Sequence, residues 1–124
     1  MNIIFSEHPY IEQLNQRYLL LSLDRIRTTP NGSYHQAWCV ISNDEININE
    51  IGHIDHLKKL HEEMMNQYRL KNWKFCQDAI EQLLGKFNGK IDSFYNEILS
   101  RVENFKKNDP GPNWDSVLDK SSIN

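Results

Sequence analysis

Three histidines lie close together at positions 53, 56 and 61, and Glu63 follows them. Imidazole nitrogens and carboxylates bind transition metals, provided that they share one face. On a helix His56 lies about 60° to one side of His53 and His61 about 80° to the other. No nearby cysteine and no His-Glu-x-x-His pattern completes a ligand set. We expect these histidines to border the core, with no cofactor. A metal-binding protein or small enzyme using His53, His56 and His61, with Glu63 nearby, is the alternative.

A second group combines two arginines with two aromatic residues. Arg25 and Arg27 lie on one expected strand, and Tyr34 and Trp38 lie on its expected partner. Such a patch can stack a nucleic-acid base or contact an anion. The net charge of −3 disfavours nucleic-acid binding, because little counterion release would accompany contact with phosphates. The four residues are predicted to bind a partner, and a nucleic-acid accessory role is the alternative.

The strip Asp109–Asp115 contains two prolines, one glycine and the tryptophan Trp114. A tryptophan has about 200 Å² of surface to bury, and prolines reduce the entropy lost when such a segment docks. We expect Trp114, with Val117 and Leu118, to cover the edge of a helical bundle. Docking of Trp114 on a partner is the alternative.

The two cysteines, Cys39 and Cys76, fall on apolar faces of an expected strand and an expected helix. A reduced thiol in such a place behaves as a small hydrophobic group. We therefore predict two core residues without a disulfide.

Alternating apolar residues predict two strands, over residues 17–26 and 34–41. Between them, Thr29-Pro30-Asn31-Gly32 has the composition of a turn, so the strands form an antiparallel hairpin. A short third strand over residues 3–5 is a further possibility. The hairpin is apolar on part of both faces, and helices can cover only one. We therefore expect the other face to form a twofold homodimer.

After residue 45 the apolar spacing changes to that of helices. Asn72 is the expected N-cap of the second helix, Asn88-Gly89 ends it, and Asp109-Pro110 ends the third. The apolar stripes cover residues 54–68, 73–87 and about 90–105. The predicted class is α+β in a single domain. It comprises a hairpin region at 1–48, packed on three antiparallel helices at 50–107, and an extended tail at 108–124.

Two resemblances concern the helices and their flanks. Tyr68, Asn72-Trp73 and Cys76 resemble one tetratricopeptide-type unit, although stacks of such units generally need about three. The order of parts resembles the C-terminal tail of bacterial class III adenylate and guanylate cyclases. This second resemblance rests on three segments: Leu23-Asp24-Arg25-Ile26-Arg27, the stretch Tyr68 to Ala79, and Pro112-Asn113-Trp114-Asp115-Ser116-Val117-Leu118 with Lys120.

The cyclase resemblance implies a helical interaction or regulatory module in the form of a separate small protein. It implies no cyclase activity, because a cyclase needs two metal-binding aspartates on a ferredoxin-like sheet. The roughly 50 residues before the helices cannot hold such a domain.

No apolar run approaches the roughly 18 residues that span a bilayer. The N-terminus also lacks the basic start and apolar stretch of a signal peptide. The sequence thus predicts a cytoplasmic protein without membrane association. Its predicted role is that of a non-enzymatic interaction or assembly module with a protein partner.

Overall fold

A computed structural model describes residues 1–5, 13–15, 17–29 and 32–119 of the chain. The chain divides into two compact units, one formed by residues 1–43 with 115–124 and the other by residues 44–114. The first unit contains a four-stranded sheet, and the second contains helices α2, α3 and α4. The predicted α+β class is therefore confirmed.

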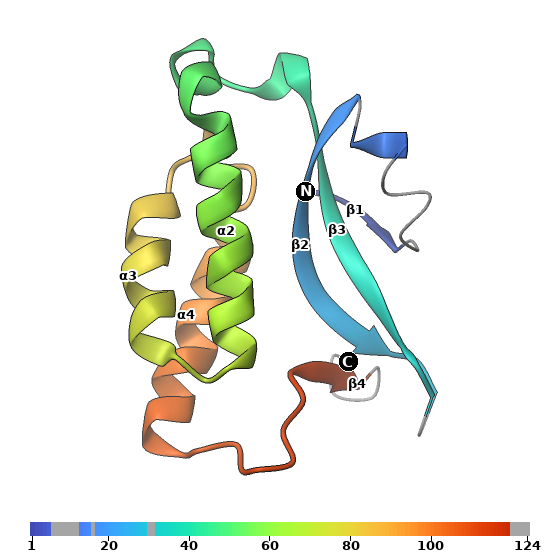
Figure 1. Cartoon of the computed structure of the whole chain (residues 1–124), viewed down its shortest axis with the longest axis vertical. Coiled ribbons are helices and arrows are strands. Elements are labelled where there is room, and N and C mark those ends of the chain that lie inside the picture. The colour runs from blue at the N-terminus through green and yellow to red at the C-terminus, as the bar shows by residue number, and fades with distance from the viewer. Residues whose placement is uncertain (6–12, 16, 30–31, 120–124) are drawn as a thin grey trace. The chain divides into compact units, whose positions relative to one another are not determined.

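The sheet of the first unit has the strand order β1-β3-β2-β4. Its strands are β1 (Asn2–Phe5), β2 (Tyr18–Arg27), β3 (Tyr34–Ser42) and β4 (Val117–Asp119). β3 pairs antiparallel with both β1 and β2, which confirms the hairpin and the short third strand. β4 pairs parallel with β2 (Figure 1). The sheet is thus mixed, and the expectation of a simple hairpin with an unpaired tail is wrong.

The turn between β2 and β3 has the hydrogen bond that is common in four-residue turns. The amide of Gly32 donates to the carbonyl oxygen of Thr29 at 3.0 Å. Pro30 and Asn31, the expected central residues, lie outside the described residues.

A β-bulge interrupts the pairing of β2 with β3. Ser22 pairs with Trp38 and Arg25 with Gln36, so β2 contains one residue more than its partner. The Gln36 amide donates to the carbonyl oxygens of Leu23 at 2.9 Å and Asp24 at 3.4 Å. Because backbone groups in a bulge lose ladder partners, these bonds stabilise it. The bulge also shifts the side-chain alternation of β2 by one residue.

The apolar residues of β2 are buried on both faces of the strand. Leu20 and Leu21 point to opposite faces, and both are fully buried. Trp38 and Val40, which share the face of Leu20, are half-buried. The expected continuous open apolar face at Leu20, Trp38 and Val40 is therefore absent. Leu20 therefore offers no open surface to the dimer that was predicted through this face.

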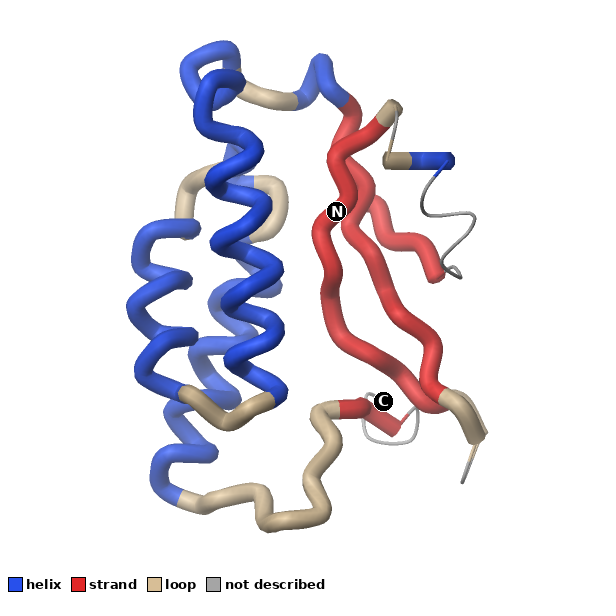
Figure 2. The backbone as a smooth tube through the Cα atoms, in the orientation of Figure 1, coloured by secondary structure: helices blue, strands red, loops and turns tan. Residues whose placement is uncertain are grey.

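Successive helices of the second unit run in opposite directions and lie side by side (Figures 1 and 2). They are α2 (Ile54–Arg69), α3 (Trp73–Leu83) and α4 (Asp92–Lys107). Short 3-10 helices precede α2 and α4 at η1 (Asn43–Glu45), η2 (Ile48–His53) and η3 (Phe87–Gly89). The side-chain oxygen of Asn72 accepts from the Phe75 amide at 3.4 Å, which confirms the predicted N-cap.

Helix α3 ends earlier than its apolar stripe predicts. Gly85, Phe87 and Asn88 have φ values of 83°, 53° and 57°, which a right-handed helix cannot accommodate. The fully buried Phe87 nevertheless continues the stripe from η3. The Glu50 carboxylate fixes this turn by accepting a 2.7 Å hydrogen bond from the Phe87 amide. Burial of Phe87 therefore does not require a continuous helix.

The described residues contain no helix that is both long and apolar enough to cross a bilayer.

Candidate functional site

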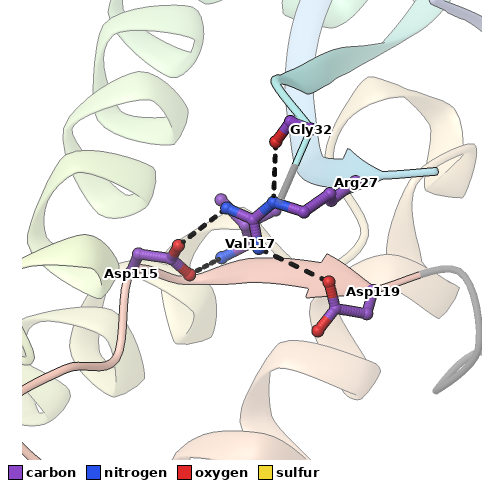
Figure 3. Close-up of polar contacts among 5 residues, drawn as sticks. All are labelled: Arg27, Gly32, Asp115, Val117 and Asp119. Atoms are coloured by element: carbon purple, nitrogen blue, oxygen red, sulfur yellow. Dashed lines mark hydrogen bonds and ion pairs between the residues drawn. The ribbon is translucent and has the colours of Figure 1, made fainter. Parts of the chain in front are cut away.

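Arg27, at the end of β2, holds the C-terminal strand of the chain (Figure 3). Its Nη2 lies 3.0 Å from Oδ2 of Asp115, and its Nη1 lies 3.4 Å from Oδ1 of Asp119. Its Nε donates to the carbonyl oxygen of Gly32 at 2.9 Å. One guanidinium thus binds two carboxylates from the tail while the hairpin turn fixes its orientation.

The electrostatics of this cluster favour the ionised forms. Asp115 accepts from the Val117 amide at 3.0 Å through Oδ1 and binds Arg27 through Oδ2. The Val117 hydrogen bond and the Arg27 guanidinium lower the pKa of Asp115 below its ordinary value. In turn, the hydrogen bond to Asp115 raises the pKa of Arg27. Both groups stay charged across the physiological range.

The contacts that hold β4 in the sheet are weak. It pairs with β2 over only three residues, Arg25–Arg27, and its Val117 and Leu118 side chains are half-buried. Just before it, Ser116 has a φ of 67°, a conformation that is strained for a residue other than glycine. The buried Ser116 hydroxyl has no hydrogen-bond partner among the described residues. Val117 and Leu118 belong to the sheet of the first unit, through the pairing of β4 with β2.

Arg25 and Arg27 share one face as alternate residues of β2, and the bulge before Arg25 places that face on the side of Tyr34 and Trp38. Its guanidinium carbon lies 4.8 Å from the centroid of the Tyr34 ring, a cation–π contact. Its Nε also donates to Gln36 at 3.2 Å. Trp38 follows on this face, and its buried indole N–H has no hydrogen-bond partner among the described residues. The four predicted patch residues therefore lie on one face of the sheet. Arg27, however, is already bound by Asp115 and Asp119 of the tail.

Trp114 packs within the second unit against three other rings. Its centroid lies 5.4 Å from that of Tyr68, 5.6 Å from that of Trp73 and 5.3 Å from that of Phe105. These residues come from the end of α2, the start of α3 and the end of α4. Edge-to-face contacts of this kind stabilise aromatic clusters. Trp114 covers the end of its own helical unit.

The strip before Trp114 is tied to Lys71, in the turn between α2 and α3. The Lys71 ammonium donates to the carbonyl oxygen of Gly111 at 2.6 Å and lies 3.3 Å from Oδ1 of Asp109. The same Asp109 oxygen accepts from the Gly111 amide at 2.8 Å. The hydrogen bond from Gly111 and the contact with Lys71 lower the pKa of Asp109.

The three histidines do not form a common site. His61 is fully buried, and its Nδ1 lies 2.8 Å from the hydroxyl oxygen of Tyr95. His61 is thus part of the buried face of α2, whereas the neighbouring Leu60 is only half-buried. The expected position of His61 at the solvent boundary is wrong, because Tyr95 supplies a polar partner inside the core.

His53 and His56 instead line a surface pocket of about 580 Å³ in the second unit. Leu57 and Leu60 give it an apolar part, and Glu50 and Lys86 also reach it. Glu63 lies apart from it and accepts a 2.8 Å hydrogen bond from Gln67. Among residues 1–5, 13–15, 17–29 and 32–119, no three His, Cys, Asp or Glu side chains form a group that could hold a metal ion.

The two thiols are placed as core residues. Cys39 and Cys76 are both buried, which confirms their predicted place in the core. The Cys76 thiol donates to the carbonyl oxygen of Met64 at 3.6 Å. Burial raises the pKa of Cys76 to about 12, so the thiol remains protonated and weakly nucleophilic.

β1 forms one edge of the sheet and exposes apolar side chains. Ile3 is 50% exposed and Phe5 is 56% exposed. Both point to the same face of the strand, as alternate residues do. Asn2–Phe5 includes no charged residue and no proline, the usual features that prevent edge strands from pairing with other chains.

Sequence reasoning missed Asp115 and Asp119 as partners of Arg27, and Gln36 as the residue that supports the bulge. The spacing of the two aspartates around Val117 and Leu118 was a weak indication of a short strand with acidic ends. No family model, curated protein or solved structure matches the chain.

Proposed function

We propose that this chain is a non-enzymatic assembly module of the cytoplasm that forms a twofold homodimer through the edge strand β1. The observation that carries the proposal is the exposed, uncharged edge with Ile3 and Phe5 on one face. In an antiparallel pairing of two β1 strands about a twofold axis at Ile4, Ile3 of each copy lies opposite Phe5 of the other. The pairing would bury both side chains and continue the sheet.

A non-enzymatic role is supported by the state of the reactive side chains described above. Both thiols are buried, and His61 is engaged with Tyr95. The resemblance to the cyclase tail implies the same class of role, in which the α2–α3 pair would act as a tetratricopeptide-like surface. Neither resemblance supplies the identity of a further protein partner.

Light scattering coupled to size exclusion tests the proposal at micromolar concentration. We expect the wild-type chain to be dimeric and the Ile3→Lys/Phe5→Lys variant to be monomeric, because two added charges per edge would repel the second copy. The matched control is Ile48→Lys, which adds a charge at a 79% exposed apolar residue of the other unit and should remain dimeric. A wild-type monomer would overturn the proposal.

A further inference from the structure

We propose that the edge of β2 at Arg25–Arg27 is a binding site for an extended acidic segment of another protein. In the absence of that segment, the chain's own residues 115–119 occupy the site. The proposal is independent of the β1 dimer, since β1 and β4 form opposite edges of the sheet.

Arg27 is oriented so that its two terminal nitrogens face the tail. The bond from Nε to the Gly32 carbonyl leaves both terminal nitrogens of Arg27 to contact acceptors on the tail. They reach two separate carboxylates, Asp119 at the end of β4 and Asp115 two residues before its start. A guanidinium fixed in this way selects for paired carboxylates at that spacing.

The backbone of β2 at this edge pairs with that of β4. Arg25, Ile26 and Arg27 align with Val117, Leu118 and Asp119 in parallel register. Main-chain hydrogen bonding of this kind recognises any extended segment, while neighbouring side-chain contacts provide selectivity. Together with Arg27, this edge therefore fits a strand with an aspartate on either side of aliphatic residues.

The contacts that hold residues 115–119 at this edge are weak. Its two carboxylates are 55% and 58% exposed, so water competes with Arg27 for them. Ser116 combines a left-handed backbone with a buried hydroxyl that lacks a partner among the described residues. Short, exposed and strained segments open more readily than the core of a sheet. A competing acidic segment can therefore take the place of β4.

The experiment uses a fluorescently labelled peptide with the sequence of residues 113–119, followed by anisotropy. It is titrated with the full wild-type chain and with the full-length Asp115→Asn/Asp119→Asn variant, which retains Arg27. We expect the variant to bind the peptide on the order of tenfold more tightly, because a weaker resident segment leaves the site open in more molecules. A peptide with asparagine at both aspartates should bind the variant less tightly than the acidic peptide.

Two protein controls make the test specific. Asp78→Asn removes an exposed carboxylate that binds Lys74 at 2.9 Å on α3, and should leave peptide binding at the wild-type level. Adding Arg27→Gln to the double variant should reverse its gain in affinity. Should the double variant fail to fold, as judged by circular dichroism, Asp119→Asn alone is used, because it keeps both contacts of Asp115. Equal affinity of the variant and the wild type, or equal binding of the acidic and amide peptides, would overturn the proposal.

Discussion

Nδ1 of His61 lies 2.8 Å from the hydroxyl oxygen of Tyr95, and both side chains are fully buried. The two residues come from α2 and α4, so their hydrogen bond ties two helices of the second unit together inside its core. Their rings also contact each other at a centroid distance of 5.6 Å. A buried polar pair of this kind is costly to break, because each group has exchanged water for the other.

Removal of the Tyr95 hydroxyl should therefore destabilise the protein. We expect Tyr95→Phe to lower the free energy of unfolding by roughly 1–3 kcal/mol, since it deprives a buried imidazole nitrogen of its partner. Urea denaturation followed by circular dichroism measures the change. Tyr18→Phe, which removes a more exposed hydroxyl, is the control and should shift the value by less than about 0.5 kcal/mol.

A double variant separates the hydrogen bond from packing. His61→Leu/Tyr95→Phe should cost less than the sum of the two single changes, because both partners of this hydrogen bond are removed together. Strictly additive losses would show that the two groups do not stabilise each other.

Acid should release the C-terminal strand. The pKa of Asp115 is lowered in the folded protein from an ordinary value of 3.8, so its ionised form stabilises the folded state. This contribution is complete above that ordinary value and is lost as the pH falls through the lower folded pKa. We expect the NMR signal of the Val117 amide, which donates to Asp115, to shift over this acidic range.

The variant Asp115→Asn should abolish this titration of Val117. Asp109→Asn is the matched control, because the Asp109 carboxylate also has a lowered pKa but interacts with Gly111 and Lys71 instead. Retention of the acidic shift in Asp115→Asn would contradict the assignment.

Loss of the Trp114 ring should weaken the helical unit. We expect Trp114→Ala to lower the free energy of unfolding by about 1–3 kcal/mol, less than for a fully buried tryptophan because this ring is half-buried. Trp114→Phe should cost less, since it keeps a ring beside Tyr68, Trp73 and Phe105. Urea unfolding compares both variants with Leu70→Ala, a change at a strongly exposed residue. An unchanged stability in Trp114→Ala would be incompatible with this packing.

The thiols should be inert in the folded protein. Cys76 is buried with a pKa raised to about 12, so almost no thiolate is present at pH 8. Ellman's reagent should therefore label neither Cys76 nor the buried Cys39 until guanidinium unfolds the chain, when two thiols per molecule react. Rapid labelling of the native protein would contradict the burial of these residues.

Several elements could be predicted because their determinants are local in the sequence. The N-cap at Asn72 needs only a side chain that can reach an amide three residues later. The hairpin follows from two alternating runs around a turn. The end of α3 was missed because Phe87 keeps the apolar spacing, although Gly85 and Asn88 adopt left-handed conformations. Apolar periodicity indicates which residues are buried. It does not indicate the backbone conformation of those residues.

The candidate sites depended on contacts between distant parts of the chain. Arg25 and Arg27 were noticed, but their common face with Tyr34 results from a bulge that Gln36 supports. The parallel pairing of β4 with β2 is too short to produce a recognisable alternation, and its partner lies far away in the sequence.

The sequence by itself determined the helices, the hairpin and the burial of both cysteines, because hydrophobic spacing and turn chemistry act over a few residues. Only the tertiary structure decided that Arg27 binds Asp115, that His61 binds Tyr95 and that Trp114 joins an aromatic cluster. Such pairings depend on how whole elements pack, since a polar or aromatic side chain takes the partner that the fold brings within a few ångströms.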